Sequence, residues 1–156
     1  MQYLKTAIML SLLILTLLLS GCSPKAQVYS TDDIQTLMDA GVFDGEMVQV
    51  EGSIIALLYG IDADTVEECI CYQAINSAIS ADEVTILILT DEGTAQVAET
   101  ACQERVKSQI KTCQSYCPSA VPNLEAAVID RVGNTVLLAV GNPNILPSAV
   151  NNLHKE

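Results

Sequence analysis

Cysteine is the residue type in this chain with the widest range of possible chemistry. A thiol can carry a lipid, form a disulfide, bind a metal ion or act as a nucleophile. The 156-residue sequence contains six cysteines: Cys22, Cys69, Cys71, Cys102, Cys113 and Cys117. The first stands alone near the N-terminus and the other five lie in the body of the chain, so the two groups raise different questions.

Cys22 closes a segment that has the order of a secretory signal peptide. One early positive charge, Lys5, precedes an almost wholly apolar run over residues 7–18, and the small residues Ser20 and Gly21 follow. The stretch between Lys5 and Cys22 is about 16 residues, shorter than the ~20 that a membrane-spanning helix needs. We therefore expect this segment to be cleaved rather than to remain as a transmembrane anchor.

The residues around the expected cleavage point, Leu19, Ser20, Gly21 and Cys22, resemble the lipobox of bacterial lipoproteins. There the cysteine thiol receives a diacylglyceryl group by thioether linkage before signal peptidase II cuts on its N-terminal side. Two acyl chains anchor a protein stably, since each buried methylene contributes about 0.8 kcal/mol. The motif predicts a signal peptide at residues 1–21 and a lipidated tether at 22–30, held on the extracytoplasmic face of the bacterial cell membrane.

The five cysteines of the body cannot all pair with one another, because their number is odd. Cys69 and Cys71 share one face of a predicted strand, while Cys102, Cys113 and Cys117 follow one stripe of a predicted helix. Three interpretations are open: small buried hydrophobes, one or two disulfides of an exported domain, or a thiolate site for metal or redox chemistry. The last interpretation would use Cys69, Cys71, Cys113 and Cys117. Because their spacings differ from the usual C-x-x-C of metal sites, we expect no metal or cofactor.

Other patterns that could support catalysis are sparse. Asp62-Ala63-Asp64 begins like a calcium loop, but the later ligand positions and the turn glycine are missing, so a turn before a strand is expected. The single histidine, His154, has no nearby acid or nucleophile, and the sequence has neither a G-x-S-x-G motif nor a P-loop. We predict no catalytic residues and expect a protein that is not an enzyme.

The charge of the chain excludes one class of partner. Nineteen acidic residues face seven basic ones, and no lysine or arginine occurs between Asp32 and Glu104. Nucleic acid binding needs basic side chains to neutralise phosphates, so we expect no nucleic acid partner.

The apolar patterns predict one domain over residues 31–156. A short helix is expected after Asp33, a longer one over 94–115 and a last one from Pro147 to His154, while 46–59 is ambiguous and favours a helix ending at Gly60. The expected strands are 66–74, 83–90, 126–132 and 135–140. The fold class is therefore α+β: a four-stranded, mainly antiparallel sheet built from two hairpins, with helices packed on one face.

Four blocks of the sequence carry a resemblance that extends over roughly residues 30–154. They are LYGIDADTVEECICYQA, SADEVTILIL, ERVKSQIKTCQSY and AVIDRVGNTVLLAV. In order and character they resemble a family of small lipid-anchored lipoproteins of Gram-positive gut anaerobes, classified as a domain of unknown function. The resemblance implies an extracytoplasmic domain and brings no catalytic residues. A non-enzymatic domain that binds a protein, peptide or envelope component is the expected function, with the thiol-redox or metal-binding protein as the alternative.

Overall fold

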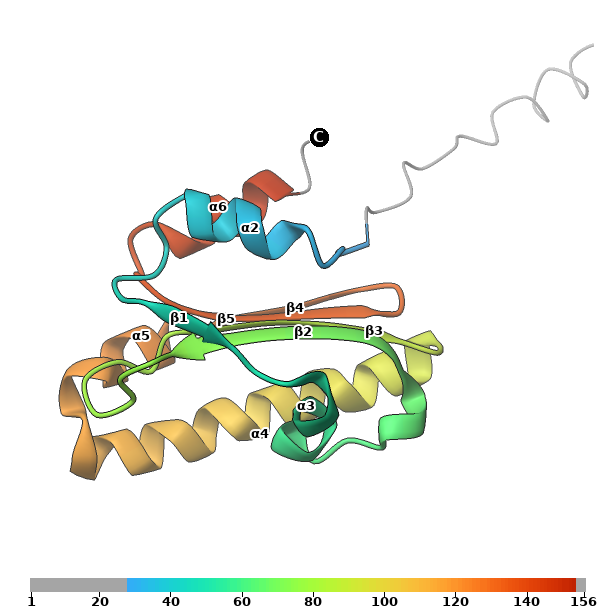
Figure 1. Ribbon diagram of the computed structural model, residues 1–156, viewed down its shortest axis with the longest axis horizontal. Helices are drawn as coiled ribbons and strands as arrows, with labels where there is room; N and C mark the ends of the chain where they lie inside the picture. The colour runs from blue at the N-terminus through green and yellow to red at the C-terminus, as the bar shows by residue number, and fades with distance from the viewer. Residues whose placement is uncertain (1–27, 154–156) are drawn as a thin grey trace, which may run out of the picture.

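One antiparallel sheet organises the computed structural model, which describes residues 28–153 (Figure 1). The predicted signal peptide, the lipobox with Cys22, and His154 lie outside the described residues. The sheet has five strands in the order β1-β2-β3-β5-β4. Their bounds are Met47–Gln49 for β1, Val66–Ala74 for β2, Glu83–Leu89 for β3, Val128–Val132 for β4 and Thr135–Val140 for β5.

The two predicted hairpins are confirmed. Strand β2 pairs with β3 and β4 pairs with β5, both antiparallel, and the hairpins are joined by antiparallel pairing of β3 with β5. The second hairpin turns at Gly133-Asn134, where Gly133 has a φ of 57°, a conformation that glycine adopts without steric cost.

The prediction of four strands is wrong, because the ambiguous stretch 46–59 contains a fifth. Its first part forms β1, which pairs with β2 through Met47 and Ala74, and its second part forms helix α3, Gly52–Tyr59, ended by Gly60 with a φ of 66°. A strand of three residues is too short to show a clear alternation. It exists because the distant end of β2 supplies its hydrogen-bond partners.

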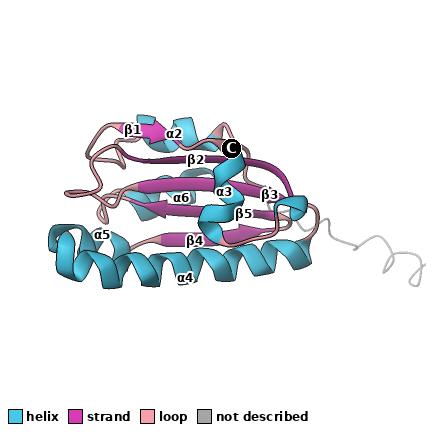
Figure 2. Cartoon of the chain, turned by 60° about the horizontal axis from the view of Figure 1, so that its bottom comes forward, coloured by secondary structure: helices cyan, strands magenta, loops and turns pink. Residues whose placement is uncertain are grey.

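Helices cover both faces of the sheet, which corrects the prediction that they pack on one. Figures 1 and 2 show α3, α4 and α5 on one side, here called the α4 face, and α2 and α6 on the other, called the α6 face. The bounds not yet given are Asp33–Asp39 for α2, Glu92–Tyr116 for α4, Val121–Glu125 for α5 and Leu146–Leu153 for α6.

The central strands require a helical layer on each face of the sheet, because they carry apolar residues on both faces. In β3, Leu87 and Leu89 join the hydrophobic cluster of the α4 face, while Val84 and Ile86 join the cluster of the α6 face. Adjacent residues of a strand point to opposite sides, so a strand with apolar residues on both faces must be covered twice. The short helices α2 and α6, near the two ends of the domain, cover the α6 face.

Helix α4 is the longest element and has the buried stripe that its sequence predicts. Ala98, Cys102, Val106 and Cys113 are buried on the side that meets β3, β5 and β4. Its N-terminus is closed by a capping box between Asp91 and Thr94. At 1.5 Å per residue its 25 residues span about 37 Å, which is longer than the roughly 23 Å of the seven-residue strand β3 that it covers.

The packed domain begins earlier than residue 31, since Tyr29 belongs to the core of the α6 face rather than to the tether. Its side chain is 2% exposed, and its backbone N–H donates to the hydroxyl of Thr135 at 3.0 Å. Its own hydroxyl donates to Asp130. Within the described residues, no helix is both long and apolar enough to cross a membrane.

Gly141, just after β5, provides a test of this packing. A Cβ there would lie 2.7 Å from both the carbonyl oxygen and a methyl group of Val42, so Gly141→Ala must push two segments apart. We expect a loss of about 1–3 kcal/mol in the free energy of unfolding, measured in urea. Gly45→Ala is the matched control, because no atom lies within 4 Å of its Cβ position. Equal stability of the two variants would contradict the described approach of β5 to the loop after α2.

Candidate functional site

Glu83, the first residue of β3, is the most conspicuous polar group of the α4 face. It is 1% exposed, and an ionised carboxylate in such a place must be paired. Arg105 of α4 supplies the charge through two parallel hydrogen bonds, from Nε to Oε1 and from Nη2 to Oε2, both 2.7 Å. This bidentate pair fixes α4 against the start of the central strand.

Three further side chains donate to the same carboxylate. The amides of Gln73 on β2 and Gln109 on α4 donate to Oε2 at 3.2 and 3.1 Å, and the hydroxyl of Tyr59 on α3 donates to Oε1. Elements α3, α4, β2 and β3 therefore meet at one carboxylate.

The ionisation states of this cluster follow from burial and from the Glu83 charge. Burial, and then the negative charge of Glu83, raise the pKa of Tyr59 well above its ordinary value, so its hydroxyl stays protonated and donates. Burial opposes the Arg105 cation, but its hydrogen bonds and charge interaction with Glu83 prevail and raise its pKa. The guanidinium carbon also lies 5.1 Å from the centre of the Tyr59 ring, in cation–π contact.

Gln109 is the member of the cluster that is incompletely bonded. Its amide nitrogen donates to Glu83, so its carbonyl oxygen Oε1 needs a different partner. Within residues 28–153, Oε1 of Gln109 is a buried side-chain atom that has no hydrogen-bond partner. Buried polar atoms are rarely left without a partner in proteins, so this oxygen is an uncommitted acceptor of the cluster.

A groove runs beside the cluster along α4. Three adjoining hollows of about 480, 170 and 450 Å³ follow the helix from α3 to its C-terminal end, and Gln109 lines all three. We call them together the α4 groove. Its walls consist largely of short side chains, which leave the space open: Ala101, Ser108 and Thr112 on α4, and Ser77, Ser80 and Ala81 on the loop between β2 and β3.

The most exposed large apolar side chains of the described residues belong to this groove. Tyr116 is 82% exposed at one end and Leu57 is 81% exposed at the other, and both line it. The next, Ile79, is 67% exposed on the loop that forms the second wall. Apolar side chains gathered at the edge of a groove are typical of surfaces that bind another molecule.

The predicted cysteine positions are partly confirmed. Cys69 and Cys71 lie on one face of β2 and pack toward α4, and Cys71 and Cys102 are fully buried free thiols. Burial, followed by the charge of Glu83, raises the pKa of each of these two thiols to about 12. Both are therefore protonated near neutral pH and behave as small core residues.

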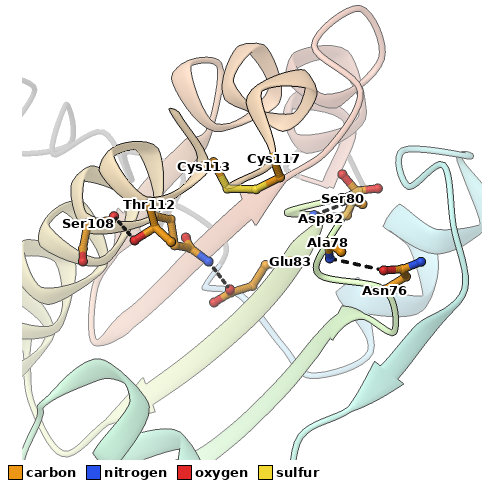
Figure 3. Close-up of a disulfide and its surroundings, with 10 residues drawn as sticks. Asn76, Ala78, Ser80, Asp82, Glu83, Ser108, Thr112, Cys113 and Cys117 are labelled. Carbon is orange, nitrogen blue, oxygen red and sulfur yellow. Dashed lines mark hydrogen bonds between the residues drawn. A yellow bond between two sulfur atoms is a disulfide. The ribbon is translucent and has the colours of Figure 1, made fainter. Parts of the chain in front are cut away.

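Cys113 and Cys117 form a disulfide at the end of α4. Their Cα atoms are 4.4 Å apart, since a spacing of four residues brings the last turn of the helix over its C-cap. Figure 3 shows this bond facing the loop that carries Ala78 and Ser80, and all four residues line the same end of the α4 groove.

The structure does not bring Cys69 and Cys71 into one site with the disulfide pair. Within the described residues no group of three or more cysteine, histidine, aspartate or glutamate side chains is placed to hold a metal ion. Asp62, considered as the start of a calcium loop, instead caps the short 3-10 helix Ala63–Thr65 by accepting from the backbone N–H of Asp64. The turn predicted before β2 is thus confirmed.

Sequence reasoning missed Glu83, Arg105, Tyr59 and Gln109 as a cluster. The available signals were weak. Glu83 is an acid at the start of a mainly apolar strand. Arg105 lies next to the buried stripe of α4 and is the first basic residue after a long acidic stretch. Neither pattern identifies a partner, because the residues come from elements far apart in the sequence.

Comparison with known proteins places the chain in a family. Residues 40–141 match the family described as Domain of unknown function (DUF4358), and the chain belongs to it. The predicted resemblance to a domain of unknown function is confirmed, and it covers the sheet together with α3, α4 and α5. No curated protein and no solved structure matches the chain.

Removal of the Arg105 cation tests the role of the cluster in folding. Arg105→Met leaves Glu83 buried without its partner, and we expect a loss of about 3–5 kcal/mol in the free energy of unfolding in urea. Arg131→Met is the matched control: its pair with Glu99 is 2.8 Å long but its side chain is 31% exposed, and such pairs contribute about 1 kcal/mol or less. Similar losses in both variants would show that the Glu83 pair has no special structural role.

The buried thiols predict how stability changes in alkali. Between pH 9 and 10 the thiols of the unfolded chain lose protons while those of Cys71 and Cys102 keep them. The folded state then binds more protons than the unfolded state, so stability must fall as pH rises, by up to ~1.4 kcal/mol per pH unit for each thiol. Urea unfolding at pH 9.0, 9.5 and 10.0 measures this slope. The variant Cys71→Val/Cys102→Ala should have a smaller slope, and an unchanged one would contradict the assignment.

Proposed function

We propose that this protein is a lipid-anchored extracytoplasmic domain that binds a partner and catalyses no reaction. The observation that carries the proposal is the α4 groove, an open surface that combines exposed apolar residues with a buried, unpartnered amide oxygen. Concave sites with apolar lining and a few placed polar groups are the usual form of binding sites in proteins.

The buried polar groups support a binding role over a catalytic one. The carboxylate of Glu83 accepts from Arg105, Tyr59, Gln73 and Gln109, so its oxygens are committed to holding the fold. The buried thiols are protonated and lie beneath α4, where they have little nucleophilic character.

Two features support export and anchoring. The residues Leu19 to Cys22 have the lipobox pattern, and the bond between Cys113 and Cys117 is of the kind that persists in oxidising compartments outside the cytoplasm. The chain joins the domain at Tyr29 on the α6 face. The α4 groove lies on the opposite face of the sheet from Tyr29.

A thiol-redox protein is the second candidate, because the disulfide between Cys113 and Cys117 lines the groove. It would use Cys113 and Cys117 without Cys69 and Cys71. A Cys113→Ser/Cys117→Ser variant that still binds its partner would favour the binding function. Reduction of a disulfide substrate by the unmutated protein, lost in this variant while its fold is retained, would favour the redox one.

Photo-crosslinking in the producing cells tests the binding role. A benzophenone amino acid is introduced singly at Leu57, Tyr116, Val97 and Asp39, which are exposed positions on different parts of the surface. We expect a discrete adduct that depends on the position of the probe. Absence of any position-dependent adduct at all four sites would contradict a binding function.

Lipid anchoring has a direct test. Cys22→Ala should abolish acylation and leave an unprocessed precursor, because the thioether needs a thiol. Detergent partitioning and intact mass measure the outcome, with Cys69→Ala as the control that keeps the anchor. An unchanged mature mass in the Cys22 variant would rule out the lipoprotein assignment.

A further inference from the structure

We propose that the α4 groove binds an extended peptide segment of another extracytoplasmic protein, with apolar side chains at the two ends and a basic side chain in the middle. The inference rests on the proposed binding function and specifies its partner.

The dimensions of the groove suit an extended chain. Its lining on α4 extends from Ala101 to Tyr116, a separation of fifteen residues or about 22 Å along the helix axis. An extended peptide advances about 3.3 Å per residue, so six or seven residues fill this length. The groove has room for a chain because both walls carry short side chains, including Ser108 on the helix and Ser77 on the loop.

The two ends of the groove are apolar and separated by a polar middle. Leu57 and Tyr116 present nearly their whole side chains to solvent at the ends. Covering such side chains with apolar residues of a partner removes both surfaces from water and favours binding. A continuous lipid chain does not match this pattern, because it would place methylene groups against Arg105 and Gln109 in the middle.

The polar middle is suited to a donor with positive charge. Within the described residues Oε1 of Gln109 is an acceptor without a partner, and three acidic side chains, Asp82, Glu83 and Glu104, line the groove. Arg105 is paired with Glu83 and Lys107 with Glu104, so acids still outnumber bases at this place. A lysine side chain supplies three N–H donors and the charge of opposite sign. The hydroxyls of Ser77 and Ser108 can bond the backbone of an extended chain, which has a donor and an acceptor at each residue.

The position of the chain entry indicates that the occupant is a different polypeptide. Tyr29 is packed on the α6 face, on the other side of the sheet from the groove. The first described residues therefore lie on the face opposite the α4 groove, and within residues 28–153 no segment of this chain fills it.

Fluorescent heptapeptide pools test the proposal on the full chain purified in detergent. The first pool has Leu at positions 1 and 7, Lys at position 4, and Ala, Ser or Thr elsewhere; the second replaces Lys by norleucine, and the third replaces both Leu residues by Ser. Fluorescence anisotropy should show binding of the first pool at least tenfold tighter than of either other pool. Equal binding of the three pools, or no binding of the first, would overturn the proposal.

Matched variants locate the binding. Leu57→Ser/Tyr116→Ser should weaken binding of the first pool at least tenfold, while Val97→Ser, an equally simple change of an exposed side chain on α4, should leave it unchanged. Gln109→Leu should reduce the preference for Lys over norleucine. Equal effects of the groove and control variants would overturn the groove as the site.

Two outcomes separate this inference from the broader function. Position-dependent adducts in cells through Val97 or Asp39 alone would retain a binding domain and overturn the α4 groove as its site. A dimer in sedimentation experiments that dissociates on Leu57→Ser/Tyr116→Ser would identify a second copy of this chain as the occupant, and would overturn the peptide.

Discussion

The ionised carboxylate of Glu83, buried under the longest helix, is the constraint on which the arrangement of the α4 face depends. Removing two charges from water costs several kcal/mol per ion, so a buried pair of this kind contributes little net stability compared with apolar residues. Its consequence is geometric. The fork of Arg105 matches the carboxylate in one orientation, and the ring of Tyr59 packs under the guanidinium. The pair therefore determines where α4 and α3 lie relative to β3.

That placement of α4 also creates the open surface beside it. The helix contacts β3, β5 and β4, and α3 covers part of β2, so the α4 groove remains between them and the loop that joins β2 to β3. Gln109 connects the two features, because its nitrogen donates to Glu83 and its side chain lines the groove. A ligand bonded to Oε1 of Gln109 would contact the same network that holds the helices, which links binding to the stability of this face.

The cysteines of the body illustrate how one residue type takes different roles according to its surroundings. Cys71 and Cys102 are enclosed by α4 and the sheet near a buried carboxylate, and remain protonated thiols. Cys113 and Cys117 lie at the end of the same helix, where the chain turns and brings them together as a disulfide. The sequence left these roles open because spacing places residues on a helix face or a strand face but does not reveal which of them meet.

The sequence by itself determined the features that depend on neighbouring residues. Alternating apolar residues and the Gly133-Asn134 turn predicted both hairpins, and the 3.6-residue period predicted the buried stripe of α4. The tertiary structure decided the rest: the fifth strand, the second helical layer, the place of Tyr29 in the core and the Glu83 cluster. These features join residues tens of positions apart. A local pattern can show that a residue needs a partner or a cover, but only the folded chain selects which distant residue supplies it.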